Sequence, residues 1–324
     1  MRRVLYALLP ATLAYVWFFG WGILVNAALA IAAALAAEAL ALRATDRPVR
    51  QGLLDASALV TAVLLAFAIP PLAPWWLPAL GAILAIVLAK HLYGGLGYNP
   101  FNPAMVGYVV LLVSFPAEMT QWIPPQLEAF DYPRLPVWAS LDYALTGALP
   151  AGLGIDALTQ ATPLDRVREG LGRMQTLQEI QVGPLFGTVG GSGWEWINGF
   201  IGLGGLYLIY RGVIRWHIPV ALIGTLGAFA LLLHAFDPGR FPSAGFHVFS
   251  GATLLGAFFI ATDPVSAATT DRGRLFYGAG IGLLTYTIRT WGGYPDGIAF
   301  AVLLMNATVP LIDRYSRPRI YGRA

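Results

Sequence analysis

The chain contains no cysteine. It therefore cannot ligate an iron–sulfur cluster, form a disulfide framework or use a thiol in catalysis. Histidine is nearly as scarce, and its four occurrences are scattered along the chain: His91, His217, His234 and His247. A haem site formed by two of these histidines stays an open alternative, although we favour packing or interfacial roles for them. We expect no metal site, so an electron carrier bound to this chain would be organic.

Nucleotide-binding signatures and charge are also lacking. No Gly-x-Gly-x-x-Gly follows a strand and no Walker A lysine is present, so we expect this chain not to bind NAD or ATP itself. Only 11% of the residues are charged, against roughly 25% in ordinary soluble domains. All of the basic residues except Lys90 are arginines, and most flank apolar segments. That pattern indicates membrane topology rather than a nucleic-acid partner.

Apolar residues, in contrast, make up 57% of the chain, and its mean hydropathy is +0.65. A spanning helix needs about 20 apolar residues, and shorter half-helices can be buried among neighbours. Ten segments fit this description: 4–19, 22–42, 53–69, 75–93, 104–115, 194–210, 218–235, 248–262, 275–291 and 297–312. We predict an all-α polytopic membrane protein with about ten transmembrane helices. No cleavage site follows the first apolar run, so we expect that run to be retained.

The basic residues predict the orientation, because cytoplasmic loops carry an excess of them. With ten spans, arginines at both termini and in most short loops fall on one side, which we take as the cytoplasmic face of a bacterial inner membrane. The long polar segment 116–193 then lies in the periplasm. The predicted domains are a first membrane repeat at 1–115, this periplasmic segment at 116–193, and a second membrane repeat with a basic cytoplasmic tail at 194–324.

The two membrane halves share a weak internal similarity. Residues 57–61 are similar to 250–254, and residues 94–101 are similar to 292–297. In the ten-span topology, each segment lies on the opposite side of the membrane from its mate. This arrangement is typical of a five-plus-five inverted repeat, in which sites lie at the repeat interface.

One candidate membrane site lies at 94–103, where glycine and proline are too dense for a straight helix. Such backbone survives at membrane depth only when it is buried in protein or lines a cavity. We interpret the segment as a broken re-entrant stretch, with Asn99 and Asn102 near a cofactor or an ion. A tight cytoplasmic hairpin is the alternative.

Ionisable residues within the predicted membrane region form a second set of candidates. They are Glu38, Asp55, Asp263, Arg289 and Asp296. All but Glu38 lie near predicted helix ends, where capping or snorkelling explains them more simply. Asp263 and Asp296 are the ones to test first, because they lie in the repeat-related turns.

The polar segment carries the most specific motif, Asp156-x-x-Thr159-x-Ala161-Thr162. This motif resembles the sequence to which bacterial flavin transferases attach FMN, through a phosphoester on the last threonine. The chemistry requires a hydroxyl on an accessible backbone rather than in a packed helix. The alternative is that Asp156-x-x-Thr159 is a helix N-cap box followed by loop.

Two neighbouring features bear on this assignment. Ser250-Gly251-Ala252-Thr253 resembles a shorter flavin-attachment motif, but it opens an apolar helix that a transferase could not reach, so we expect it to serve packing. The stretch 163–180 places leucines and a valine among charged residues and predicts a short amphipathic helix, lying on the membrane or on a partner.

Several of these stretches together carry a family resemblance that extends over essentially the whole chain. Residues 94–105, 250–267, 292–297 and 310–313 are similar to the D subunit of the Rnf electron-transport complex. The B membrane subunit of the sodium-pumping NADH:quinone reductase is a related but poorer match. The chain departs from its relatives at the N-terminus, where the first apolar run begins without their longer polar lead.

The resemblance implies a flavin-carrying component of an ion-translocating ferredoxin:NAD oxidoreductase, moving Na⁺ or H⁺. It implies covalent FMN on Thr162, with Asp156, Thr159 and Ala161 read by the flavin transferase, and a second noncovalent flavin such as riboflavin in the membrane part. It implies as partners the A and E membrane subunits, the B and C iron–sulfur subunits, and the flavin-bearing G subunit. A channel or transporter without a redox cofactor, and a purely structural component, are the rival interpretations.

Overall fold

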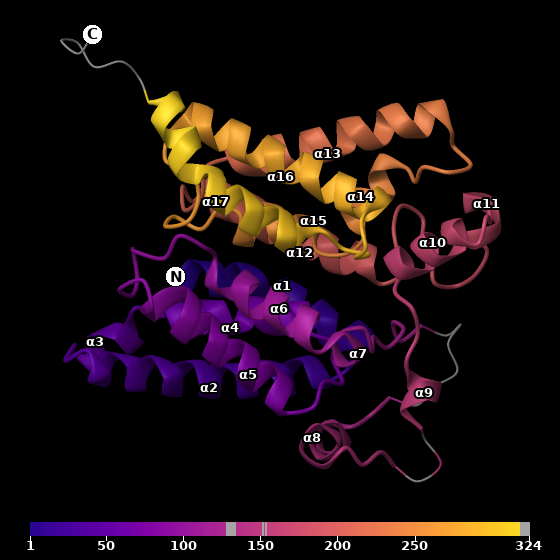
Figure 1. Ribbon diagram of the computed structural model, residues 1–324. Helices are drawn as coiled ribbons and strands as arrows, with labels where there is room; N and C mark the ends of the chain where they lie inside the picture. Colours follow the sequence, from indigo (N-terminus) through magenta and orange to yellow (C-terminus); the bar gives the residue numbers. More distant parts are fainter. Residues whose placement is uncertain (128–133, 151, 153, 318–324) are drawn as a thin grey trace.

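The computed structural model describes residues 1–127, 134–150, 152 and 154–317 (Figure 1). Within these ranges the chain is helical, and its one β-type contact is an isolated bridge between Phe186 and Gly191. In the described part of the chain, three helices are long and apolar enough to cross a membrane by themselves: Gly22–Ala44, His217–Phe236 and Ile298–Ser316. This is consistent with the predicted all-α membrane protein.

The first half consists of helices whose ends are set by proline, glycine and local caps. Asp55 Oδ1 accepts the backbone N–H of Ser57 at 2.7 Å, just where a helix begins, and Asn102 accepts the N–H of Met105 at 3.2 Å. The elements are α1 (Arg2–Phe19), α2 (Gly22–Ala44), α3 (Val49–Leu54), α4 (Ser57–Ala68), α5 (Trp76–Leu84), the π-helix η1 (Ala85–His91) and α6 (Pro103–Ser114).

In its described residues, the polar segment that follows forms short helices only: α7 (Pro116–Met119), α8 (Val137–Thr146), α9 (Ile155–Leu158), α10 (Pro163–Gly172) and α11 (Leu177–Ile180). The prediction of one amphipathic helix over 163–180 is therefore wrong. The helix is interrupted between α10 and α11, where Met174 has a left-handed φ of 62°. The apolar side of the pair is buried: Leu164, Val167, Leu177 and Ile180 cluster with Phe246 of the second half.

The second half contains the remaining helices. They are α12 (Trp194–Tyr210), α13 (His217–Phe236), α14 (Ala244–Phe249), α15 (Thr253–Leu255), the π-helix η2 (Gly256–Ile260), α16 (Asp271–Trp291) and α17 (Ile298–Ser316). The expected helix at 248–262 is interrupted, because residues 250–252 between α14 and α15 are not helical. Helical structure nevertheless lies within each of the ten predicted segments; that all ten cross a membrane stays a prediction.

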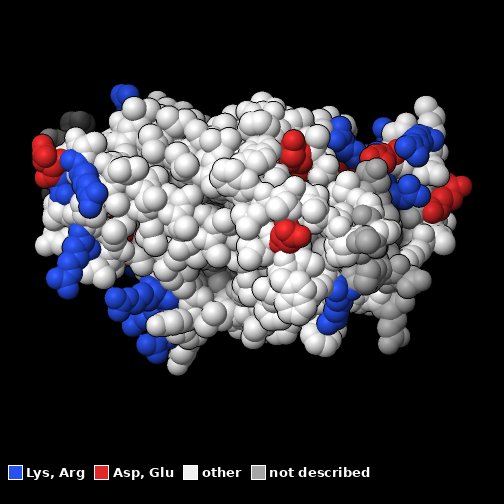
Figure 2. Space-filling model, turned by 90° about the horizontal axis from the view of Figure 1, so that it is seen from below, with Lys and Arg blue, Asp and Glu red and all other residues white. Residues whose placement is uncertain are grey.

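The two halves pack side by side, with α1 against α12 and α6 against α17 (Figure 1). Helices α10 and α11 lie at one end of the molecule, and Met1 and the end of α17 lie toward the other. Seen from below, charged side chains gather at the two ends and leave a mostly uncharged belt between them (Figure 2). Such a belt suits a protein whose sides face hydrocarbon.

Candidate functional site

A cavity of about 300 Å³ lies between the two halves, at the end where α10 is found. Its walls come from α1, α4, α6, α12, α15 and α17, together with the polar segment. Among the described residues, six aromatic side chains line it: Tyr15, Phe67, Tyr108, Trp122, Trp194 and Tyr294. Several of these rings contact one another, with centroids 5.2 Å apart for Trp122 and Trp194 and 5.0 Å for Tyr15 and Phe67. The cavity is therefore a mainly apolar, aromatic chamber.

Thr162 lies at this cavity as the N-cap of α10. Its backbone is extended, with φ −66° and ψ 162°, and Pro163 begins the helix, where a missing N–H costs nothing. The Thr162 hydroxyl donates to Asp165 Oδ2 at 2.5 Å and accepts the Asp165 backbone N–H at 3.2 Å. Asp165 Oδ2 also accepts the Thr162 N–H at 3.2 Å, which completes a capping box. The hydroxyl thus lies on non-helical backbone, at the boundary between loop and helix.

Charge in the cavity is confined to three of the described lining residues, namely Asp165, Arg168 and Asp296. Burial raises the pKa of the Asp165 carboxyl above its ordinary value, and the hydrogen bonds from Thr162 oppose that shift. Arg168 is exposed and is the one cation of the three. An anionic group brought into the cavity would therefore have a guanidinium available to it.

Asp296 is part of a clasp that holds the non-helical residues 250–252. Arg289 Nη2 lies 2.9 Å from Asp296 Oδ1, Arg289 Nη1 donates to the His247 carbonyl at 2.6 Å, and Asp296 Oδ2 accepts the Ala252 N–H at 2.7 Å. Gly251 lies inside this clasp with φ 64°, and a Cβ there would come within 2.4 Å of Asp296 Oδ2. The clasp therefore fixes the wall of the cavity next to α10.

The three predicted transferase-recognition residues lie just before Thr162. Asp156 belongs to α9, and its side chain is outside the described part of the structure. Thr159 has an extended backbone, φ −98° and ψ 142°, and Thr159 and Ala161 are half-buried. The N–H of Gln160 donates to the Trp122 carbonyl at 2.8 Å, which ties this stretch to the cavity wall. The N-cap of α9 is Gly154, so the expected alternative of an Asp156 cap does not hold, and the capping box lies at Thr162 instead.

The other membrane-site candidates surround a second cavity of about 300 Å³. Asn99, Asn102 and Asp263 line it together with Lys90, whereas Asp296 lines the first cavity. Asn102 Nδ2 donates to the Ile260 carbonyl at 3.2 Å, and the Asn102 N–H donates to Asn306 Oδ1 at 3.0 Å, so the segment joins the two halves. Asp263 Oδ2 accepts the Ser266 hydroxyl at 2.7 Å. The four candidates are thus divided between two sites.

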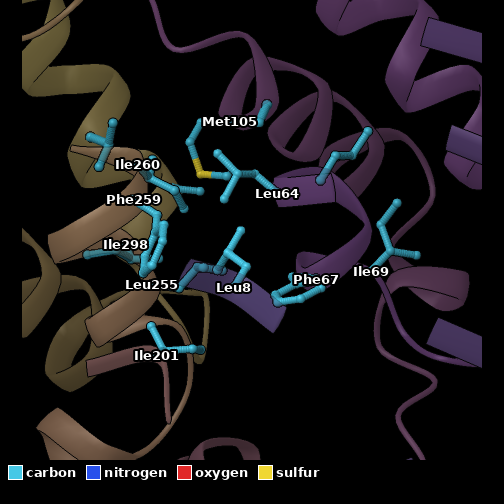
Figure 3. Close-up of a cluster of buried hydrophobic side chains, with 14 of the residues drawn as sticks. Leu8, Leu64, Phe67, Ile69, Met105, Ile201, Leu255, Phe259, Ile260 and Ile298 are labelled. Carbon is cyan, nitrogen blue, oxygen red and sulfur yellow. The ribbon is translucent and has the colours of Figure 1, made fainter. Parts of the chain in front are cut away.

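One buried apolar cluster, part of which is drawn in Figure 3, supplies lining residues to both cavities. Met105 and Ile260 line the first cavity, and Leu64 and Phe259 line the second, while all four belong to one buried cluster. Figure 3 shows these side chains converging from both halves. No polar lining residue is shared by the two cavities among the described residues.

Two groups of residues were not predicted from the sequence. Lys90 Nζ lies 2.7 Å from Glu38 Oε1 and 2.7 Å from Ser57 Oγ, and His91 Nε2 lies 3.1 Å from Glu38 Oε2, all deep in the first half. Glu38 was a candidate, but its partners were not, since they are distant in sequence. Asp165 was also missed, although Thr162-x-x-Asp165 is itself a recognisable capping box.

Thr253, of the second flavin-like motif, is fully buried and donates its hydroxyl to the His247 carbonyl at 2.7 Å. This burial agrees with a packed position; that the motif carries no flavin stays a prediction. Arg289 and Asp296 pair with each other, and Asp55 receives the Ser57 hydroxyl at 2.6 Å, so each of these ionisable residues has a local partner.

The fold and the site together describe a helical protein of two packed halves that enclose an aromatic cavity bordered by a hydroxyl and a carboxyl group. The family model described as NQR2, RnfD, RnfE matches residues 1–322, and the chain belongs to that family.

Curated relatives match almost the whole chain. A protein of Pectobacterium atrosepticum is 53% identical over 331 residues, which cover 99% of this chain and 93% of the relative. Proteins of Escherichia fergusonii and Aliivibrio salmonicida are 51% and 52% identical, each over 99% of this chain and 93% of its own length. All three are named as the D subunit of an ion-translocating oxidoreductase complex.

Proposed function

We propose that this chain is the D subunit of an ion-translocating oxidoreductase complex, and that it relays electrons through FMN esterified to Thr162. The observation that carries the proposal is the position of Thr162, whose hydroxyl borders the aromatic cavity between the two halves. The preceding stretch supplies the sequence pattern of a flavin-attachment site, with Asp156, Thr159 and Ala161 as the residues that a flavin transferase reads.

The cavity suits a flavin in size and in chemistry. Its volume of about 300 Å³ lies at the lower end of small-molecule sites, roughly 300–1,000 Å³. Trp122, Trp194 and Tyr108 would pack against an aromatic ring system, and Arg168 would face the phosphoester. The flavin supplies one- and two-electron chemistry when bound, while the protein orients it, excludes water and tunes its electrostatics.

The electron path implied by the family runs between ferredoxin and NAD, coupled to Na⁺ or H⁺ translocation. We propose the A, B, C, E and G subunits of the Rnf complex as partners, because the matching family includes RnfD and the curated relatives are named as subunits of an ion-translocating oxidoreductase complex. The chain itself would bind neither NAD nor nucleic acid.

We further propose that the two halves are a five-plus-five inverted repeat in a bacterial inner membrane. In support, α2 packs against α4 and α5, and correspondingly α13 packs against α14 and α16. The contacting pairs α1 with α12 and α6 with α17 occupy equivalent places in the two halves. With Met1 on the cytoplasmic side, α10 and Thr162 lie at the periplasmic end.

The second cavity is the proposed place of a second, noncovalent flavin such as riboflavin. Asn99, Asn102 and Lys90 offer hydrogen-bond donors there, and Asp263 offers an acceptor. Asn99 Oδ1 is buried and has no hydrogen-bond partner among the described residues, which favours a polar ligand at this place.

An inverted-repeat channel without a redox cofactor is the second candidate. The two cavities share one buried apolar cluster in their walls, and this favours a channel because an apolar constriction can gate a pore. A channel, unlike a flavoprotein, would be colourless and would not depend on the Thr162 hydroxyl.

The deciding experiment is in-gel fluorescence of the denatured chain, produced with and without a flavin transferase. A fluorescent band that requires the transferase supports the redox role. A dark band with a transferase that labels a known substrate would leave the channel as the better account.

A further inference from the structure

The Thr162 hydroxyl is held by a carboxyl group of its own chain. Thr162 Oγ1 and Asp165 Oδ2 are 2.5 Å apart, with the hydroxyl as donor. In the described part of the chain, Asp165 is the one residue whose side chain bonds this hydroxyl. A threonine hydroxyl is a weak nucleophile and reacts readily only when a base within hydrogen-bond reach takes its proton.

The surroundings of Asp165 allow it to act as such a base. Arg168 and Glu169 on α10, Asp296 on the loop before α17, and Tyr108 on α6 are the charged and titratable groups that face it. Burial raises the pKa of the Asp165 carboxyl, which makes its carboxylate a stronger base than an exposed aspartate. The nearby Arg168 guanidinium and the hydrogen bonds from Thr162 oppose this rise in pKa, and burial outweighs them.

We propose that Asp165 is the proton acceptor for flavin attachment to Thr162, so that the chain supplies part of the chemistry of its own modification. The inference rests on the proposed function, because it assumes that Thr162 is the attachment residue. The flavin donor would be a flavin dinucleotide. Thr162 Oγ1 attacks the flavin-side phosphorus, the Oγ–P bond forms as the phosphoanhydride P–O bond breaks, and the nucleoside monophosphate leaves. The hydroxyl proton passes to Asp165 Oδ2, and no group is oxidised or reduced.

The transfer also explains how the N-terminus of α10 tolerates the product. After esterification Oγ1 can no longer donate, and a carboxylate would face the new phosphoester anion at close range. Protonated Asp165 avoids that repulsion, and free backbone N–H groups in the first turn of α10 can donate hydrogen bonds to the phosphoester anion.

A matched control lies on the next helix. Thr176 and Glu179 form the same capping box on α11, with Thr176 Oγ1 and Glu179 Oε2 2.8 Å apart. This pair is exposed, and neither residue lines the aromatic cavity. Glu179→Gln therefore measures what loss of a capping carboxylate does to the fold, without touching the acceptor hydroxyl.

The test is the initial rate of covalent labelling of the purified full-length chain, made without transferase and then incubated with purified transferase and FAD. Intact mass measures the labelled fraction for the wild type, Asp165→Asn, Asp165→Glu and Glu179→Gln, between pH 6 and pH 9. We expect Asp165→Asn to label at least about tenfold more slowly, toward the 10²–10⁴-fold typical of a lost general base. Asp165→Glu should recover most of the rate, and Glu179→Gln should label like the wild type.

The pH profile separates a chemical role from a structural one. If Asp165 takes the proton, the Asp165→Asn rate should rise steeply toward pH 9, where hydroxide replaces the carboxylate; a misfolded variant would gain nothing. Equal rates and profiles for Asp165→Asn and the wild type would overturn the inference and leave the proposed function standing. A flat, slow Asp165→Asn profile would also overturn it, in favour of a capping role. An unlabelled wild type would instead contradict the proposed function itself.

Discussion

Helices α10 and α11 begin with the same local device in two different surroundings. Thr162 with Asp165 and Thr176 with Glu179 each form a complete capping box. In both, a threonine is followed three residues later by an acidic residue, which is the sequence pattern of a helix start. The first box borders an aromatic cavity between the two halves, and the second is exposed. The pKa of Asp165 is raised, chiefly by burial, whereas hydrogen bonds from Thr176 lower the pKa of Glu179. Local sequence makes the cap, and tertiary packing makes one of the two caps a candidate site.

The largest expected effect separates the two threonines completely. Thr162→Ala should abolish covalent flavin, because the ester oxygen is removed, while Thr176→Ala should leave the label intact. In-gel fluorescence of each variant, made with the transferase, measures this. A fluorescent Thr162→Ala band, or a dark Thr176→Ala band from a folded chain, would break the distinction between the boxes.

A second, smaller effect concerns the docking of α10 on the second half. Gly251→Ala places a Cβ 2.4 Å from Asp296 Oδ2 and 2.6 Å from Leu164 Cδ1, at a φ of 64°. We expect a loss of about 1–3 kcal/mol in the free energy of unfolding, from overpacking and left-handed strain. Thermal unfolding in detergent measures it. Gly97→Ala is the control, because Gly97 has a φ of 94° and an added Cβ there would meet no atom within 4 Å. It measures backbone strain without overpacking and should lower the free energy of unfolding by less.

The caps themselves should differ in stability. Thr162→Ala should cost about 1–2 kcal/mol, because an N-cap is lost and the partly buried Asp165 carboxyl loses its donors. Thr176→Ala should cost less, because water can replace the lost bonds of an exposed Glu179. Chemical denaturation of the two unlabelled variants provides the comparison, and an equal or reversed order would contradict it.

The smallest expected effect is on the pH dependence of folding stability, which should have opposite signs for substitutions in the two capping boxes. A carboxyl whose pKa is raised in the folded state adds stability at low pH that is lost as pH rises through the folded pKa. A carboxyl whose pKa is lowered adds stability at higher pH that is lost as pH falls through the folded pKa. Relative to the wild type, Asp165→Asn should therefore gain stability as pH rises from about 4, and Glu179→Gln should lose it. Melting temperatures between about pH 3.5 and pH 6 reveal the two slopes.

Much of the helical framework could be predicted from the apolar runs. Long apolar runs such as 22–42 and 218–235 form α2 and α13 with nearly the predicted bounds. A run of about 20 apolar residues has the length and composition of a membrane-spanning helix, so its structure is readily predicted. The break at 250–252 was not foreseen, since it depends on Arg289 and Asp296, which lie about 40 residues away in sequence. The interruption after α10 was missed because its apolar spacing continues across Met174.

The candidate site could be predicted only in part. Thr162 and the candidates Asn99, Asn102, Asp263 and Asp296 were chosen from sequence, and these five residues line cavities in the structure, whereas Thr159 and Ala161 of the Thr162 motif do not. That Asp296 lines the Thr162 cavity while the other three line the second is a matter of tertiary packing. The ion pair between Lys90 and Glu38 joins η1 to α2, and other helices lie between these two elements in the sequence. A rule based on residue spacing within one helix could therefore not predict it.

The most direct test of covalent flavin at Thr162 is peptide mapping by mass spectrometry of the full chain produced with a flavin transferase. The predicted result is an FMN-sized mass increase on the peptide that contains Thr162, with unmodified peptides that contain Thr176 and Thr253. An increase on another residue, or an unmodified Thr162 peptide from cells whose transferase is active, would contradict it.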